Sequence, residues 1–153
     1  MEASRILPDL QCSVLCEEVR QEVTGNLFLI GVIDAIRVPQ LPVVAFRLMI
    51  FNRWTAGVGQ FVETVRLLAP DQTVIQKTET RFAMKDPYIN ATSVSLLQQV
   101  EFKAPGPHFI EVLVDNVLKV RYPIHVLLVA MPGQPQAAPQ APQPPTDGTA
   151  TAS

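Results

Sequence analysis

The chain has little of what marks several common protein classes. Its 153 residues include only two cysteines, and its net charge is -2, from 12 Lys and Arg against 14 Asp and Glu. Because it offers no basic field that attracts phosphates, no nucleic-acid partner is expected. The longest apolar run of the first third, Leu27 to Ile33, is far shorter than the ~20 residues of a membrane-spanning helix. No membrane association is expected either.

The N-terminus and the cysteines both indicate a reducing compartment. Met1-Glu2-Ala3-Ser4 has an acidic residue where a secretory signal carries positive charge. Cys12 and Cys16 lie roughly 13 Å apart if both are on one strand, beyond the ~7 Å limit for a disulfide. We therefore expect two reduced thiols in a cytoplasmic protein.

Strong catalytic signatures are also missing. The sequence has no Gly-rich phosphate loop, no nucleophile elbow and no two-histidine metal motif. Neither His108 nor His125 has a Cys or a carboxylate at a convincing ligand spacing. Asp71, Asp86 and Asp115 each stand alone, as turn formers do, rather than as calcium ligands. We expect no enzyme, no cofactor and no metal.

What the sequence does have, from Gln11 to Ala130, is a series of short apolar or alternating runs separated by turn residues. This pattern predicts an all-β fold, specifically an antiparallel β-sandwich of about eight strands, immunoglobulin-like or similar. The domain is expected to span residues 8–130. The predicted strands cover residues 11–22, 26–37, 43–54, 60–68, 73–84, 91–102, 107–114 and 117–129.

The sequence also predicts which strand is central in its sheet and which strand lies at an edge. The run from Val43 to Phe51 is apolar on both alternating faces except at Arg47, which indicates a central strand. The N-terminal strand, with Glu17 and Glu18, is expected at an edge, where charge discourages pairing with another molecule.

Asp34 and Arg47 are the polar exceptions in two apolar runs. If strands 26–37 and 43–54 form a hairpin centred near Gln40 and Leu41, Asp34 lies directly opposite Arg47. We predict a structural ion pair between them, because two such exceptions in facing strands explain each other. The alternative is that Asp34 is a buried general base.

The last hairpin is predicted to turn through the three residues Val114-Asp115-Asn116, with Asn116 left-handed. A two-residue loop would instead put Lys119 on the apolar face of Val112. In the three-residue register, His108 and His125 project from opposite faces of the sheet. The predicted alignment places Ile110 and Val112 with Leu118, Val120 and Tyr122, and Glu111 opposite Lys119.

After residue 130 the composition changes. Residues 131–153 contain six of the 14 prolines and no aromatic residue, so they cannot bury enough apolar surface to offset the entropy of ordering. We expect a disordered Pro/Ala/Gln-rich tail there.

The motif Cys16-Glu17-Glu18-Val19-Arg20-Gln21-Glu22, followed by Leu29-Ile30-Gly31-Val32-Ile33-Asp34, resembles the start of a family of small bacterial proteins of unknown function. Pro105-Gly106 before Phe109-Ile110-Glu111-Val112, and Tyr122-Pro123-Ile124-His125-Val126, are similar to the same family. The resemblance covers residues 12–128 and implies a β-sandwich, without a substrate or a catalytic residue.

Three functions are compatible with this sequence. The first is a non-catalytic bacterial protein-binding or assembly module that meets its protein partner through an edge strand or an end loop. The second is small-molecule binding or hydrolysis in a cleft, carried by groups such as Asp34, Arg47 or His108. The third is a structural subunit of a bacterial or phage assembly. The oligomeric state stays open.

Removing residues 132–153 should leave the melting temperature unchanged, because all predicted strands lie before the tail. Thermal unfolding of the full and truncated chains measures this. A loss of several degrees on truncation would show that the tail packs on the domain.

Overall fold

The computed structural model describes residues 4–130, which form nine strands and no helix. The all-β prediction is confirmed, with one strand more than expected. The predicted tail, residues 131–153, lies outside the described residues. The strands are β1 (Asp9–Gln21), β2 (Leu27–Val32), β3 (Ala35–Val38), β4 (Val43–Thr55), β5 (Gly59–Leu68), β6 (Val74–Met84), β7 (Ala91–Phe102), β8 (Gly106–Val114) and β9 (Val117–Leu128).

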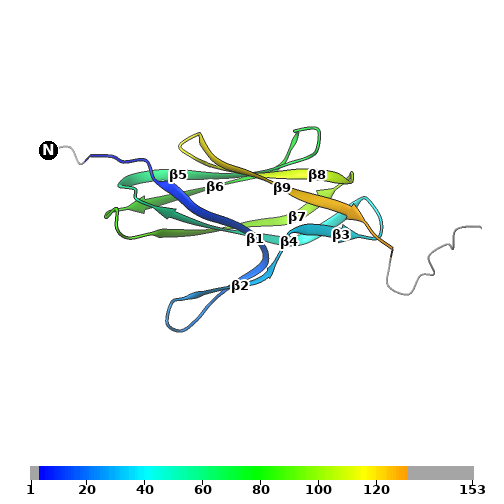
Figure 1. Cartoon of the computed structure of the whole chain (residues 1–153), viewed down its shortest axis with the longest axis horizontal. Coiled ribbons are helices and arrows are strands. Elements are labelled where there is room, and N and C mark those ends of the chain that lie inside the picture. The colour runs from blue at the N-terminus through cyan, green and yellow to red at the C-terminus, as the bar shows by residue number, and fades with distance from the viewer. Residues whose placement is uncertain (1–3, 131–153) are drawn as a thin grey trace, which may run out of the picture.

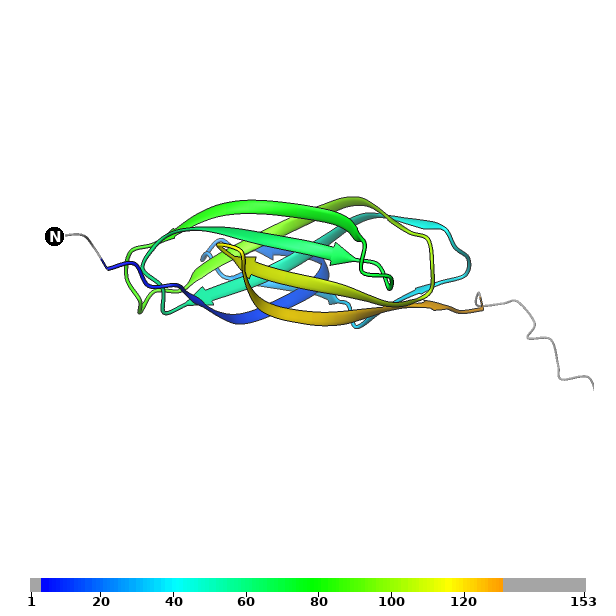
Figure 2. The same cartoon turned by 90° about the horizontal axis from the view of Figure 1, so that it is seen from above.

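The nine strands form two sheets that lie one above the other (Figure 1). The four-stranded sheet has the order β2-β1-β4-β7, and the five-stranded sheet has the order β3-β9-β8-β5-β6. All pairs are antiparallel except β3 with β9, which run parallel. The N-terminal segment and the end of β9 lie at opposite ends of the long axis (Figure 2).

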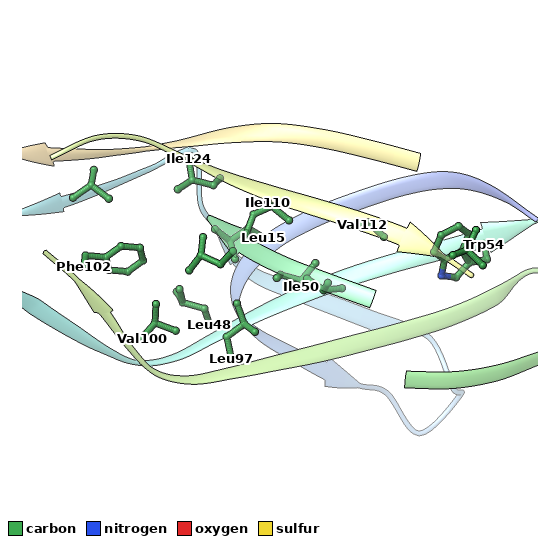
Figure 3. Close-up of a cluster of buried hydrophobic side chains, with 14 of the residues drawn as sticks. Leu15, Leu48, Ile50, Trp54, Leu97, Val100, Phe102, Ile110, Val112 and Ile124 are labelled. Carbon is green, nitrogen blue, oxygen red and sulfur yellow. The ribbon is translucent and has the colours of Figure 1, made fainter. Parts of the chain in front are cut away.

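One apolar core lies between the sheets, because alternate residues of each strand point inward. In β4 these include Leu48 and Ile50, which are 6% and 0% exposed. They pack with Val65, Ile110 and other buried side chains of the five-stranded sheet (Figure 3). As predicted, β4 is central, between β1 and β7. The edge expected at the N-terminal strand is wrong, since β1 lies between β2 and β4.

The predicted strand 26–37 is divided between the two sheets. Gly31 has a φ of +66°, a left-handed conformation that interrupts a ladder and that glycine adopts without strain. The chain then leaves the four-stranded sheet after β2 and enters the other sheet as β3, beside β9. The hairpin expected between residues 26–37 and 43–54 therefore does not form.

The last hairpin has the predicted parity for Val120 and Tyr122, but the prediction is wrong for Leu118, which pairs with Leu113, and for the loop. Asp115 and Asn116 both have positive φ, 45° and 66°, and form a two-residue turn between Val114 and Val117. A bulge next to Leu113 then restores the alternation, so that residues 110 and 112 still share a face with Tyr122 and Val120. As a result Glu111 faces Arg121, and the expected pairing with Lys119 is wrong.

Replacing Asn116 by valine should reduce the free energy of unfolding by about 1–2 kcal/mol, because a β-branched residue disfavours positive φ. Chemical denaturation measures the change. Asn116→Gly is the matched control and should be neutral or stabilising, since glycine adopts this conformation freely. Equal stability of the valine and glycine variants would contradict the left-handed turn.

Candidate functional site

The structure does not bring Asp34 and Arg47 together. Asp34 lies between β2 and β3, exposed, with its carboxylate 3.4 Å from the Arg37 guanidinium. Arg47 of β4 instead lies 3.8 Å from Glu18 of β1. The predicted ion pair is wrong. It required a hairpin between residues 26–37 and 43–54, and this hairpin does not form because the chain crosses to the other sheet after β2. Arg37 lowers the pKa of Asp34 through a side-chain hydrogen bond, which leaves no reason to regard Asp34 as a general base.

The two histidines lie on opposite faces of the five-stranded sheet, as predicted. His108 pairs with Ile124 and is 1% exposed, whereas His125 pairs with Pro107 and is exposed. Within residues 4–130, no three His, Cys, Asp or Glu side chains are grouped so that they could hold a metal ion.

Two of the three predicted turn-forming aspartates accept hydrogen bonds from their own turns. Asp71 accepts from the Thr73 amide at 3.0 Å, and Asp86 accepts from the Tyr88 amide at 2.8 Å. Asp115 accepts from the Val62 amide of a neighbouring strand at 2.9 Å.

Glu63 is a titratable group that points into the core from β5 and is 1% exposed. Its Oε2 accepts a hydrogen bond from the Trp54 indole at 2.5 Å. Its Oε1 accepts from the Asn52 amide at 3.2 Å, and from the hydroxyls of Ser93 and Ser95 at 3.0 and 3.3 Å. These donors come from β4 and β7, in the opposite sheet. We call these five residues the Glu63 network.

The Glu63 network suits a structural role better than a catalytic one. A buried carboxylate is tolerated when donors surround it, and here four donors occupy both oxygens. All five side chains are at most 8% exposed, and both carboxylate oxygens already accept hydrogen bonds, so the carboxylate is neither open nor free for a substrate. Sequence reasoning missed Glu63, although Phe61 and Val65 have the same parity and both are core residues. The signal in the sequence was a glutamate at a position of β5 where the alternating pattern otherwise places apolar residues.

The outer face of the four-stranded sheet carries rows of apolar side chains and, beside them, the ion pairs of Glu18 with Arg20 and Arg47. The register aligns Val32, Cys16, Met49 and Leu96 in one row across all four strands. Since directly paired residues point to the same side, these side chains share the face turned away from the core. Cys16 is buried there, and this burial raises the pKa of its thiol. A second row aligns Val14, Phe51 and Val94.

Many apolar side chains of this face remain open to solvent. Val94 and Leu96 of β7 are each 39% exposed, and Phe46 of β4 is 81% exposed. The β1–β2 hairpin projects from this sheet, away from the five-stranded sheet (Figure 1), and extends the surface with β2. We define the apolar face as the exposed residues Phe28, Ile30, Val32, Val44, Phe46, Val94 and Leu96.

On the outer face of the five-stranded sheet, charged side chains pair around Glu111. Arg66 lies 2.9 Å from Glu111, and Arg121 lies 3.8 Å from the same carboxylate. The Arg121 guanidinium also covers the Phe109 ring at 4.2 Å from its centroid. The exposed apolar side chains on the outer face of the four-stranded sheet therefore offer a contact area to a partner.

Comparison with family models decides the family. The model described as "Family of unknown function (DUF6941)" matches residues 11–127, which include all nine strands except the first and last few residues. The chain belongs to DUF6941. No curated protein matches the chain. The family resemblance expected from the sequence is thereby confirmed for its extent and its unknown function, and the matched DUF6941 region contains both the apolar face and the Glu63 network.

Within the described part of this DUF6941 protein, no helix is long and apolar enough to cross a membrane.

Replacing Glu63 by leucine should reduce the free energy of unfolding by ~3 kcal/mol or more, because the donors of the network lose their buried acceptor. Urea denaturation measures the loss. Glu79→Leu is the matched control on the neighbouring strand, where an exposed ion pair with Lys77 is worth about 1 kcal/mol or less. Similar losses of unfolding free energy in both variants would show that the Glu63 network does not stabilise the fold.

Proposed function

We propose that the protein is a non-catalytic protein-binding module that takes up an extended segment of a partner protein along β2. The main support for this proposal is that β2 is an edge strand of six residues without a charge. Its side chains Phe28, Ile30 and Val32 are 49%, 39% and 64% exposed. An edge strand presents unpaired backbone groups, and a long apolar edge is a site for strand addition.

The other edges of the described chain are less suited to this role. β6 carries Lys77, Glu79 and Arg81 with exposed side chains, which discourage pairing. β3 has only four residues, including Arg37. β7 lies close to β6 along the same side of the molecule, where less room remains for a further strand.

Charge around the β1–β2 hairpin suggests the chemistry of the partner. The hairpin carries the carboxylates of Glu17, Glu18 and Glu22 against the single guanidinium of Arg20. A partner segment with apolar residues at alternate positions and basic residues at its flanks is complementary to this surface. Arg20 lowers the pKa of Glu18 through a hydrogen bond, and Arg47 contributes, so the Glu18 charge persists below neutral pH.

We also propose a more specific fold class and a cellular location for the protein. The two sheets form a β-sandwich, broadly immunoglobulin-like, which is supported by the core that both sheets share. The protein works in a bacterial cytoplasm, which is supported by the two cysteines remaining free thiols. No nucleic acid, membrane or cofactor takes part in this function.

Ile30→Lys should weaken partner binding, because it places a charge at the middle of the proposed contact strand. Capture on immobilised full-length protein identifies candidates, and binding of each purified candidate is then measured. We expect at least a tenfold weaker affinity for Ile30→Lys, and slower hydrogen exchange of the Leu27–Ile30 amides in the wild-type complex.

Val117→Lys is the matched control, because Val117 is 45% exposed beside the last turn, on the other sheet. It should bind as the wild type does. Candidates that bind Ile30→Lys and wild type equally, or a complex in which β2 exchange is unchanged, would refute the proposal. Dimerisation of the pure chain that Ile30→Lys removes would also refute it, since the occupant would then be a second copy.

A further inference from the structure

The free edge of β2 offers the backbone groups of two residues to a partner strand. The Glu22 amide donates to the Asn26 carbonyl at 2.7 Å, so these two residues form a hydrogen-bonded pair of the hairpin. Such pairs alternate with non-hydrogen-bonded pairs along an antiparallel ladder, and the register places Leu27 and Leu29 in non-hydrogen-bonded pairs with β1. The N–H and C=O groups of Leu27 and Leu29 therefore point to the free edge of the projecting hairpin (Figure 1).

The carboxylate of Glu17 lies over this edge strand. A Cβ atom at Gly31 would come within 2.7 Å of the carboxyl carbon and of Oε2 of Glu17, which is closer than such atoms approach each other. The Glu17 side chain therefore crosses from β1 to β2 and fills the space that a side chain at position 31 would need. Both residues are exposed. The missing Cβ of Gly31 thus places a carboxylate beside the free edge.

The hairpin's own cations are not used by Glu17. Within residues 4–130, Glu17 takes part in none of the ion pairs. Glu18 is paired with two arginines, the nearer guanidinium 3.0 Å away. Glu22 lies in the turn, where its Oε2 accepts a hydrogen bond from the Thr24 hydroxyl at 2.9 Å. The carboxylate over the edge strand is therefore left for a cation of a partner.

We propose that Glu17 selects the partner of the strand-addition site: the bound segment carries an arginine or lysine opposite Gly31, two positions from an apolar residue opposite Leu29. This inference rests on the proposed function and specifies its partner. An added strand lies ~4.8 Å from β2, and its residues two positions apart point to the same face. Val19 pairs with Leu29 and has the parity of Glu17, so all three side chains share that face. The basic side chain meets the carboxylate while the apolar one packs on Leu29 and Val19.

The residue between these two positions points to the opposite face of the added strand. There it lies beside Ile30, which is 39% exposed, so an apolar side chain fits best. The recognised motif is therefore a basic residue followed or preceded by two apolar residues, according to the direction of the added strand. An exposed ion pair of this kind contributes more to the choice of partner than to affinity.

Selection of a phage-displayed library of random octapeptides on the immobilised full-length protein tests this inference. We expect enrichment of peptides with an arginine or lysine next to two apolar residues, and weaker binding of these peptides to Ile30→Lys. Two synthetic peptides are then titrated: the enriched sequence, and the same sequence with glutamate in place of its basic residue. Titration in ~0.15 M salt screens charges farther away than ~8 Å.

Glu17→Gln should weaken the basic peptide about fivefold, close to the most that an exposed ion pair gives. This variant keeps the shape of the side chain and so isolates the loss of charge. Glu17→Lys should reverse the preference, so that the acidic peptide binds more tightly than the basic one. Glu22→Lys is the matched control, because it makes the same charge change in the turn of the same hairpin, and it should keep the preference for the basic peptide.

The outcomes separate this inference from the proposed function. Peptides that depend on Ile30 but carry no basic residue, or that bind Glu17→Lys with the same preference as the wild type, would overturn the role of Glu17 and leave strand addition at β2 standing. Enriched peptides that bind Ile30→Lys as well as the wild type, or no enrichment at all, would overturn both.

Discussion

Burial of the Glu63 carboxylate is the constraint on which the arrangement of the two sheets depends. A buried carboxyl group requires hydrogen-bond partners at fixed positions, and Glu63 finds them in the opposite sheet, on Asn52 and Trp54 of β4 and on two serines of β7. Apolar packing alone tolerates small shifts between sheets, whereas a hydrogen bond weakens steeply with distance and angle. The network therefore fixes β5 against β4 and β7. A second polar contact between the sheets, the 3.0 Å hydrogen bond between the Ser13 and Tyr122 hydroxyls, acts the same way for β1 and β9, and burial raises the pKa of Tyr122 to about 12.

The two outer surfaces of this fixed interior differ in their exposed side chains. The five-stranded sheet pairs its charges around Glu111, so its face is already satisfied. The four-stranded sheet leaves apolar side chains exposed and ends in the uncharged strand β2. The recognition function proposed above rests on the exposed apolar side chains of the four-stranded sheet and on its edge strand β2.

The sequence predicted features that depend on local pattern. The central position of β4 follows from its apolar run, and the opposite faces of His108 and His125 follow from parity. Features that depend on distant contacts were not predicted. The transfer of the chain from β2 to β3 rests on the left-handed Gly31 and on parallel pairing with β9, whose paired residues lie 90 positions later in the sequence. The assumed Asp34–Arg47 hairpin was therefore wrong. The turn at Asn116 was placed one residue too long because a bulge on β9 corrects the alternation after a shorter loop. Glu63 could have been found from its parity, but its donors on β7 could not.

The indole proton of Trp54 reports directly on the central claim. The chain has one tryptophan, so its indole N–H gives a single NMR signal, and this group donates to Glu63 in a fully buried position. If the Glu63 network holds the sheets together, this proton exchanges with solvent only when the whole domain unfolds, and its exchange free energy equals the free energy of global unfolding measured by denaturant. Exchange that is much faster than global unfolding, and that does not respond to low concentrations of denaturant, would contradict the account.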